Sequence, residues 1–312
     1  METTVLKIGT RGSALALAQA GQVKALIEAA QPGLSVELVQ IKTSGDTMPA
    51  ETRAQTAIKG LFVKEIEEAL LSGRVDLAIH SAKDLESDLP RGLKIAAVLK
   101  REDPRDALVA AVSGQTLKTL PPETKIGVSS IRRISQLKRL RRDLEYVPIQ
   151  GNVDTRMRKL DAGEYGAIVL AACGLKRLGM ETRISEYLDP IHMMPSPAQG
   201  ALAIETRSDS TELQKMLIGL EDLPTRCEVE AERAFLKAMG GSCRVPIGAL
   251  GRVQEDHLTL EAVVLSPDGQ RAFRKSVSGS VRTAKKLGIE LASHLRAVGA
   301  DRLLYGAWAT KQ

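Results

Sequence analysis

The segment R-V-D-L-A-I-H-S-A-K-D-L, residues 74–85, joins a short strand pattern to two charged side chains. Apolar residues alternate with polar or small ones from Val75 to Ile79, which is the period of a strand. Lys83 and Asp84 follow together after this strand. Open α/β sheets place their ligand sites just beyond the carboxyl ends of their strands. The segment therefore predicts an α/β fold with a charged site at this strand end.

The sequence on both sides of this segment repeats the succession of short strands and helices. Strands are expected at residues 5–9, 36–41, 75–79, 93–99, 126–128, 146–149, 166–172 and 201–205. Helices are expected after residue 13 to about residue 30, at 61–71, 129–142 and 153–162, and from 175. The charge-dense run 101–106 marks a hinge, and the strand at 201–205 could return to the first sheet. These patterns predict an N-terminal α/β domain of residues 1–100 and 200–220 and a second α/β domain of residues 101–199.

The pattern changes from Glu221 onward. A helix is expected at 225–239, where Gly240-Gly241 provides a stop signal, and a closing helix at 282–298. Strands are expected at 245–252, 258–265 and 270–277, with a hairpin turn at 266–269. Sequential strands favour antiparallel pairing. Residues 221–312 are therefore predicted to form a small α+β domain with a three-stranded antiparallel sheet.

The composition narrows the class of ligand. Aromatic residues make up only 3% of the 312 residues, which counts against a base-stacking nucleic-acid surface. The net charge of +6 indicates either a mild basic excess or a site for an anionic ligand, and clustered arginines would favour the second. No phosphate-binding loop sequence is present, so nucleotide binding is not expected.

Metal and membrane sites are not expected either. Three cysteines are too few and too scattered for a disulfide framework or a zinc site, and four histidines lack ligand spacing. The sequence contains no apolar run of about 18 residues. Its N-terminus lacks the pattern of a signal peptide. We therefore expect a cytoplasmic protein that acts away from membranes.

Cations and hydroxyl groups recur where a strand ends and a helix begins. Helix N-termini carry unpaired N–H groups that hold anions, and arginine adds a forked donor that matches a carboxylate or phosphate. A single such arginine is more readily explained as a solvated surface residue, but five similar places favour a cleft for a polyanion. The residues at these places are Arg11, Ser13, Lys83, Ser129, Ser130, Arg132, Arg133, Gly151, Asn152, Arg156, Gly174 and Arg177.

Cys243 is the candidate reactive thiol. It lies on a Gly-rich segment beside Arg244, and a nearby cation favours the thiolate. An ordinary surface cysteine is the alternative interpretation. Cys173 and Cys227 are expected to be packing residues. His80 is expected to be a hydrogen-bonded structural residue rather than a metal ligand.

Seven motifs occur in one order along the chain. They are K-G-L-F-V-K-E (59–65), H-S-A-K-D-L (80–85), R-E-D-P-R-D-A (101–107), S-S-I-R-R (129–133), G-N-V-D-T-R (151–156), G-L-K-R-L (174–178) and G-S-C-R-V-P-I-G (241–248). Together they resemble the porphobilinogen deaminase family, also named the hydroxymethylbilane synthases. The resemblance runs from Lys7 into the C-terminal region.

The resemblance implies a transferase of porphyrin and tetrapyrrole biosynthesis, the route to haem. The family joins four porphobilinogen molecules head to tail with loss of ammonia, and releases the linear tetrapyrrole hydroxymethylbilane by hydrolysis. The chain grows on a dipyrromethane cofactor held by a thioether to a cysteine. Each pyrrole carries an acetate and a propionate, so the product is a polyanion. The implied fold is a monomer with two periplasmic-binding-protein-like (type II) α/β domains and a small α+β domain that carries the cofactor.

The resemblance also assigns roles to residues. Asp84 is the implied catalytic residue, because a carboxylate can stabilise positive charge on a pyrrole nitrogen and move protons. Cys243 is the implied cofactor attachment site, and segment 43–59 matches a mobile lid. The implied lid residues are Asp46, Lys59 and Phe62. The residues implied to bind carboxylates of cofactor and substrate are Arg11, Ser13, Ser81, Lys83, Ser129, Ser130, Arg132, Arg133, Arg156, Arg177 and Gln199.

Several positions depart from the family pattern. Gln150 stands where the family usually has arginine, and Gln55 stands where a lysine is common. Ala57-Ile58 replaces a usual Gly-Gly, and Val128 replaces a frequent hydroxyl residue. Two expected positive charges are missing. We therefore expect substrate binding, or the later steps of elongation, to be weaker than in a family member with arginine at position 150.

Two other functions are compatible with parts of the sequence. A two-domain binding protein of the periplasmic type would capture an anion, but it would have no use for Cys243 and would need a signal peptide. A basic nucleic-acid-binding protein would show steep salt dependence and a stacking surface, and the low aromatic content disfavours it.

Overall fold

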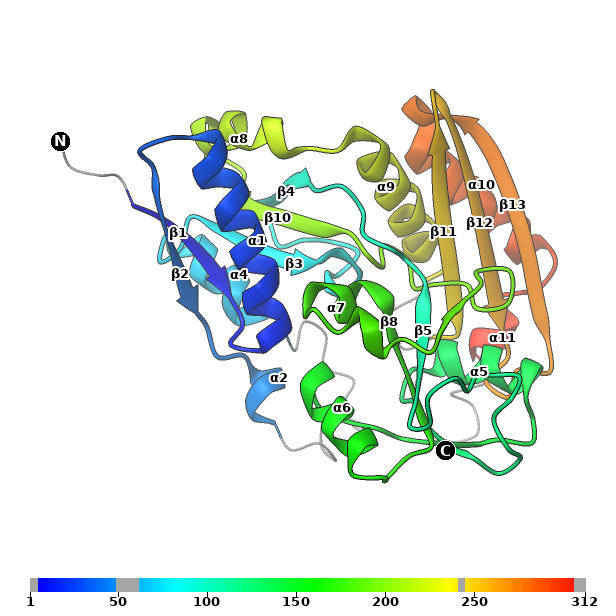
Figure 1. The fold of residues 1–312 in the computed structure, drawn as a ribbon. Coiled ribbons are helices and arrows are strands. Elements are labelled where there is room, and N and C mark those ends of the chain that lie inside the picture. Colours follow the sequence, from blue (N-terminus) through cyan, green and yellow to red (C-terminus); the bar gives the residue numbers. More distant parts are fainter. Residues whose placement is uncertain (1–4, 49–61, 241–244, 306–312) are drawn as a thin grey trace. The chain divides into compact units, whose positions relative to one another are not determined.

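The computed structural model describes residues 5–48, 62–240 and 245–305. The chain divides into two compact units, Met1–Arg101 with Ala201–Arg226, and Glu102–Gly200 with Cys227–Gln312. Each unit has its own five-stranded sheet, and the second also contains a three-stranded sheet (Figure 1). The three-domain division expected from the sequence stays a prediction.

The sheet of the first unit has the order β2-β1-β3-β10-β4. Its strands are β1 (Val5–Thr10), β2 (Ser35–Gln40), β3 (Leu77–Ser81), β4 (Leu93–Val98) and β10 (Leu202–Arg207). Its helical segments are α1 (Ala14–Ala30), α2 (Ser44–Thr47), α4 (Lys64–Leu71), η1 (Ala82–Asp84), α8 (Thr211–Leu217) and η3 (Ile218–Leu220). β1 pairs in parallel with β2 and β3, whereas β10 is antiparallel to β3 and β4. The prediction that the strand at 201–205 returns to the first sheet is confirmed.

Helices cover both faces of this sheet. α1 buries Val23 and Ile27 in one apolar cluster, and α4 buries Ile66 and Leu70 in another. A largely parallel sheet that is covered on both faces has strands with continuous apolar runs. β3 contains such a run, because Leu77, Ala78 and Ile79 are apolar and buried in succession.

The five-stranded sheet of the second unit has the order β7-β6-β8-β5-β9. Its strands are β5 (Asp106–Ala110), β6 (Lys125–Gly127), β7 (Glu145–Val147), β8 (Ala167–Ala171) and β9 (Glu186–Leu188). Its helical segments are α5 (Ile131–Leu140), α6 (Val153–Asp161), α7 (Ala172–Arg177) and η2 (Glu181–Arg183). β5 lies between β8 and β9 and is antiparallel to both. In the first sheet, β10 lies between β3 and β4 in the same way. This shared order confirms the predicted pair of type II α/β sheets with crossing strands.

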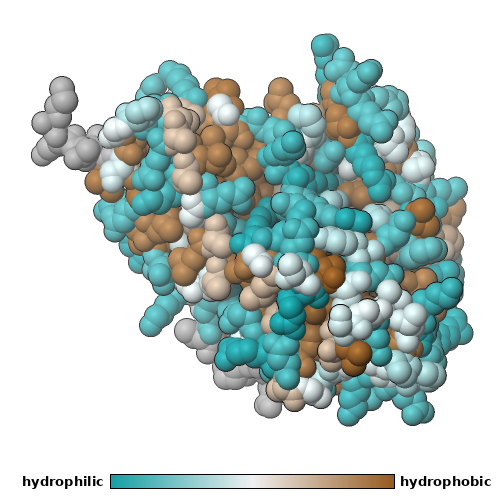
Figure 2. Space-filling view, viewed as in Figure 1, coloured by the Kyte–Doolittle hydropathy of each residue, from teal (hydrophilic) through white to brown (hydrophobic). Residues whose placement is uncertain are grey.

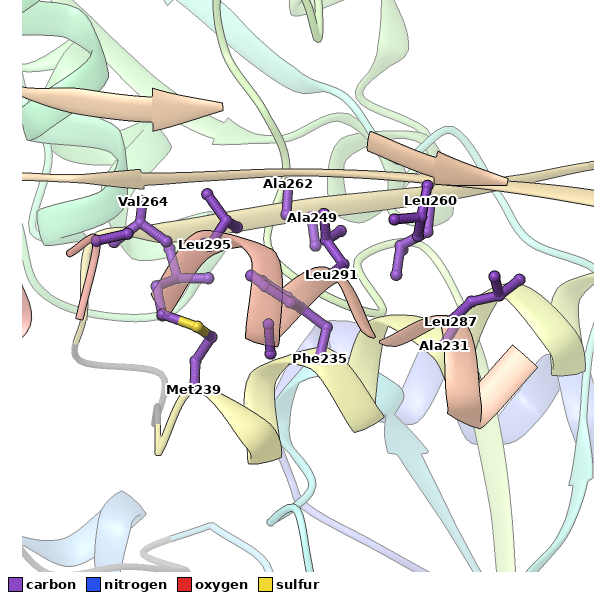
Figure 3. Packing of buried hydrophobic residues seen from close by; sticks show 14 of the residues in the cluster. Ala231, Phe235, Met239, Ala249, Leu260, Ala262, Val264, Leu287, Leu291 and Leu295 are labelled. Atoms are coloured by element: carbon purple, nitrogen blue, oxygen red, sulfur yellow. The ribbon is translucent and has the colours of Figure 1, made fainter. Parts of the chain in front are cut away.

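The end of the chain forms the predicted three-stranded antiparallel sheet, in the order β11-β12-β13. The elements are α9 (Leu223–Ala238), β11 (Ile247–Gln254), β12 (His257–Leu265), β13 (Ala272–Ser280), η4 (Val281–Thr283), α10 (Ala284–Ala297) and α11 (Arg302–Tyr305). Phe235 of α9 and Leu291 of α10 lie between the helices and the sheet (Figure 3). Gly288 of α10 allows the close approach of α9, because a Cβ at this position would lie 2.3 Å from the Ala231 carbonyl oxygen.

The sequence patterns did not predict β5, β9, α2, α8 and α11, and α2 lies in a segment that was expected to be a loop. All five residues of β5 are buried, so this strand has no alternation between apolar and polar residues, and it begins inside the charged run at 101–106. β9 has only three residues and α8 only seven. These lengths are too short for a clear period.

No helix in the described part of the chain is long and apolar enough to cross a membrane. Hydrophilic and hydrophobic residues are interspersed on the face drawn in Figure 2.

Candidate active site

Asp84 lies just beyond the end of β3. The strand ends at Ser81, and the single turn η1 carries Lys83 and Asp84 away from the sheet edge. Asp84 is exposed, whereas Lys83 is half-buried. No other residue of the described ranges forms an ion pair with the Asp84 carboxylate.

Asp84 lines a pocket of about 70 Å³ in the first unit. The polar lining residues are Arg11, Ser13, Gln19, His80, Ser81 and Asp84. The apolar lining residues are Leu15, Ala16, Phe62, Val63, Ile66 and Ile79. Five of the site residues expected from the sequence thus meet at one pocket, namely Arg11, Ser13, Phe62, Ser81 and Asp84. Apolar walls with a few convergent polar groups are typical of small-molecule sites.

Arg11 is held between a carboxylate and an aromatic ring. Its Nη2 lies 2.5 Å from Oδ1 of Asp46, and its Nε lies 3.3 Å from Oδ2. The guanidinium carbon lies 4.1 Å from the centre of the Phe62 ring, within the range of a cation–π contact. Ser13 is the N-cap residue of α1. Its side chain accepts a hydrogen bond from the Ala16 N–H, which fixes the start of the helix.

Gln19 is a pocket residue that the sequence analysis missed. It is buried on α1, and its Nε2 donates to Ser81 Oγ over 2.9 Å. Gln19, Val23 and Ile27 follow one another at intervals of four on the buried side of the helix. A glutamine in that apolar stripe was a signal, because a buried polar side chain requires a partner.

His80 is a hydrogen-bonded structural residue, as predicted. Its Nε2 lies 3.0 Å from Oε2 of Glu205 on β10, and both side chains are buried. Oε1 of Glu205 and Oε1 of Glu67 have no hydrogen-bond partner in the described part of the protein. Burial, reinforced by the charge of Glu205, raises the pKa of Glu67 to about 7.

Arg132 and Arg133 share one buried carboxylate in the second unit. Arg132 Nη1 lies 2.7 Å from Oδ2 of Asp106, and Arg133 contacts Oδ1 through Nε at 3.0 Å and Nη2 at 2.7 Å. Gln199 Nε2 adds a donor to Oδ1 at 2.9 Å. Burial alone would raise the pKa of Asp106, but the two guanidiniums outweigh it and hold the pKa far below its ordinary value. We refer to these four residues as the Asp106 cluster, which retains a net charge of +1.

Replacing Asp106 with asparagine should lower the free energy of unfolding by about 3–5 kcal/mol, because it leaves two buried guanidiniums without a counter-charge. Urea unfolding followed by circular dichroism would measure the loss. Asp103→Asn is the matched control, since Asp103 pairs with Arg105, whose side chain is 39% exposed. The control should cost at most about 1 kcal/mol. Equal losses in both variants would contradict the role given to burial.

The remaining polar residues of the second unit lie at strand ends and helix starts. Ser129 Oγ donates to the Ile149 carbonyl at 2.5 Å, and Ser130 is the first residue before α5. Arg156 is half-buried, and its Nε donates to the Gly151 carbonyl at 2.8 Å. Arg177 Nη2 donates to the Gly200 carbonyl at 2.6 Å, and burial lowers the pKa of this guanidinium.

Not every predicted site residue can be placed. Lys59 and Cys243 lie outside the described residues. Arg11, Ser13, Asp46, Phe62, Ser81, Lys83 and Asp84 belong to the first unit, and Ser129, Ser130, Arg132, Arg133, Arg156, Arg177 and Gln199 belong to the second. Cys173 and Cys227 are packing residues, as predicted, since Cys173 is buried and Cys227 packs against an apolar cluster. Within residues 5–48, 62–240 and 245–305, no group of three His, Cys, Asp or Glu residues could hold a metal ion.

The family models and the curated relatives agree over almost the whole chain. Residues 6–215 match the family model "Porphobilinogen deaminase, dipyromethane cofactor binding domain", and residues 226–297 match "Porphobilinogen deaminase, C-terminal domain". A porphobilinogen deaminase of Syntrophobacter fumaroxidans is 47% identical over 97% of this chain and 98% of its own. One of Roseiflexus castenholzii is 48% identical over 96% of this chain and 99% of its own. A TRAP periplasmic solute binding protein from Desulfovibrio salexigens aligns at 13% identity and a TM-score of 0.42, over 70% of this chain and 72% of its own.

Proposed function

The chain belongs to the porphobilinogen deaminase family, and from this we propose which of its residues carry out the family's reaction. The protein is a transferase of tetrapyrrole biosynthesis, a hydroxymethylbilane synthase. It joins four porphobilinogen molecules head to tail with loss of ammonia, on a covalently bound dipyrromethane, and releases hydroxymethylbilane by hydrolysis. The proposal concerns Asp84, Cys243 and the residues that bind carboxylates.

Asp84 is the proposed catalytic residue. Loss of the amino group from porphobilinogen leaves a cationic azafulvene, whose charge is shared with the pyrrole nitrogen. A carboxylate beside that nitrogen stabilises the charge. In its protonated form the same group can give a proton to the leaving amine, and the carboxylate that results can accept one from the newly joined ring. The observation that carries the proposal is the exposed Asp84 carboxylate, free of an ion pair to any described residue, at a pocket that also contains Arg11 and Ser13.

The described residues fit a cofactor that carries several carboxylates. In the Asp106 cluster two guanidiniums face one carboxylate, so a positive charge remains buried without an equal counter-charge. A buried, uncompensated cation is expected to attract an anion. When bound through Cys243, the dipyrromethane supplies the pyrrole carbon to which the first porphobilinogen is joined.

The proposed carboxylate-binding residues are Arg11, Ser13, Ser81, Lys83, Ser129, Ser130, Arg132, Arg133, Arg156, Arg177 and Gln199. Guanidinium donors match the forked geometry of acetate and propionate groups. Asp46, Lys59 and Phe62 are proposed to belong to a lid. We also propose that the enzyme works as a cytoplasmic monomer, without nucleic acid or membrane partners.

The intact mass of the purified protein tests this proposal. When it is produced in a host that makes porphobilinogen, its mass should exceed that of the polypeptide by a covalently bound dipyrromethane. The same protein should consume porphobilinogen and release ammonia. An unmodified mass in well-folded, inactive protein would contradict the assignment of the cofactor.

Gln150 stands where the family usually has arginine, and its replacement tests the effect of that missing positive charge. It is half-buried in the loop between β7 and α6, directly before Gly151, whose carbonyl accepts from Arg156. Gln150→Arg should lower the KM for porphobilinogen by about two- to tenfold, as expected for one added charge-assisted hydrogen bond. Steady-state kinetics and the distribution of enzyme-bound intermediates would measure the change. Unchanged values would show that the enzyme does not depend on a cation there.

A further inference from the structure

Arg11 makes its two-point contact with a carboxylate of its own chain. Its Nη2 and Nε lie 2.5 and 3.3 Å from the two oxygens of Asp46. A guanidinium binds the acetate or propionate of a pyrrole in the same forked geometry. The Nε and Nη2 donors of Arg11 are therefore already occupied by Asp46.

Asp46 is fixed in the position from which it reaches Arg11. Thr43 Oγ1 donates to Asp46 Oδ2 at 2.8 Å, and the Thr43 N–H donates to the same oxygen at 3.4 Å. Burial alone would raise the pKa of Asp46, but hydrogen bonds from Arg11 and Thr43 outweigh it, so the pKa lies below its ordinary value. Asp46 is therefore ionised at neutral pH, and it neutralises Arg11.

This ion pair differs from the Asp106 cluster in two respects. The Arg11 and Asp46 side chains are 21% and 27% exposed, whereas the Asp106 side chain is fully buried. The Arg11–Asp46 pair has no net charge, whereas the Asp106 cluster retains one positive charge. A carboxylate that approaches Arg11 from solvent is therefore not attracted until Asp46 moves away, and the exposure of the pair makes this exchange possible.

We propose that Asp46 occupies the place on Arg11 that a pyrrole carboxylate takes during the reaction, so that the incoming carboxylate must displace it. The inference rests on the proposed role of Arg11 in binding substrate. With such competition, the apparent affinity for substrate is the intrinsic affinity multiplied by the fraction of molecules in which Arg11 is not paired with Asp46. Asp46 thereby sets the affinity for substrate. The alternative is that Asp46 orients Arg11 for its ligand, in which case its removal would weaken binding.

The two roles predict opposite changes in the KM of an Asp46→Asn holoenzyme for porphobilinogen. If Asp46 competes, KM should fall by roughly two- to fivefold, the range expected for loss of a partly exposed ion pair. Initial rates of porphobilinogen consumption would measure it, on protein whose mass shows a bound dipyrromethane. Asp46→Glu should bring KM back toward the native value. An unchanged or higher KM in Asp46→Asn would overturn the inference.

Glu65→Gln is the matched control for a change in the anchoring of α2. Glu65 Oε1 accepts from the Ser44 N–H at 2.8 Å, so it also fixes this helix, but it makes no contact with Arg11. The glutamine loses the negative charge of this acceptor and so weakens the anchor, but it should leave KM unchanged. If this variant lowers KM as much as Asp46→Asn does, the effect comes from a looser α2, and competition for Arg11 is excluded.

Arg11→Gln separates failure of this inference from failure of the proposed function. It should raise the KM for porphobilinogen by about tenfold or more, because a charge-assisted contact is lost. If Arg11→Gln raises KM but Asp46→Asn does not lower it, only the competition is disproved. If Arg11→Gln leaves KM unchanged, the role of Arg11 in binding substrate is itself wrong.

Discussion

An Asp84→Asn holoenzyme is expected to consume porphobilinogen about 10²–10⁴-fold more slowly than the native protein, the range for loss of a positioned acid–base group. Asparagine keeps the shape of the side chain but removes both its negative charge and its ability to accept a proton. Stabilisation of a cationic intermediate is lost at the same time, and such electrostatic contributions are of similar size. The loss should appear in kcat rather than in KM, because the carboxylate acts on the developing charge.

Asp88→Asn is the control for this variant. Asp88 is exposed and follows Asp84 by four residues, but it does not line the pocket. Its replacement should leave kcat within about twofold of the native value, as for most exposed substitutions. Intact masses would show whether each variant carries the dipyrromethane. A cofactor-loaded Asp84→Asn protein with near-native turnover would rule out the catalytic role.

A Cys243→Ser protein is expected to have the mass of the bare polypeptide and no measurable turnover. A thioether forms from the thiolate, and a serine hydroxyl is far less acidic than a thiol, so it does not provide an equivalent nucleophile at neutral pH. We expect a complete loss of activity, because the growing chain then lacks its covalent anchor. Mass spectrometry and an assay of porphobilinogen consumption would measure both results.

Cys227→Ala provides the comparison for the serine variant. Cys227 is half-buried in α9 and packs against an apolar cluster. Its replacement should keep the excess mass and the activity, at a cost in stability of about 1 kcal/mol. Loss of the excess mass in Cys227→Ala, with its retention in Cys243→Ser, would move the attachment site to Cys227.

The fold was largely predictable where burial leaves a period in the sequence. α1, α6 and α10 have apolar stripes, and the patterns place them within a few residues of their observed ends. β5 shows why the rest was not predictable. It is paired on both edges and buried throughout, so it has no alternating pattern, and its first residue, Asp106, looks like part of a charged loop.

The candidate site shows the same limit for side chains. Sequence reasoning identified Arg132 and Arg133 as cations at a helix start, but not that Asp106 lies between them, because that contact joins β5 to α5 across 26 and 27 residues. Gln19 was missed although it sits in an apolar stripe, since its partner Ser81 is 62 residues away. Partners that are distant in sequence are set by sheet order, which local patterns do not contain.

β10 lies between β3 and β4, so the strand pairing of the first unit's sheet cannot be completed until Arg207 has been synthesised. The second sheet, whose strands all lie between Asp106 and Leu188, is complete in sequence before β10 has been made. Roughly 100 residues follow β4 before β10 is finished, which takes on the order of 5–20 s at ribosomal rates. Throughout that interval the facing edges of β3 and β4 lack their partner strand, and open edges recruit other chains. The nascent polypeptide is therefore expected to depend on chaperones most strongly while its middle third emerges from the ribosome.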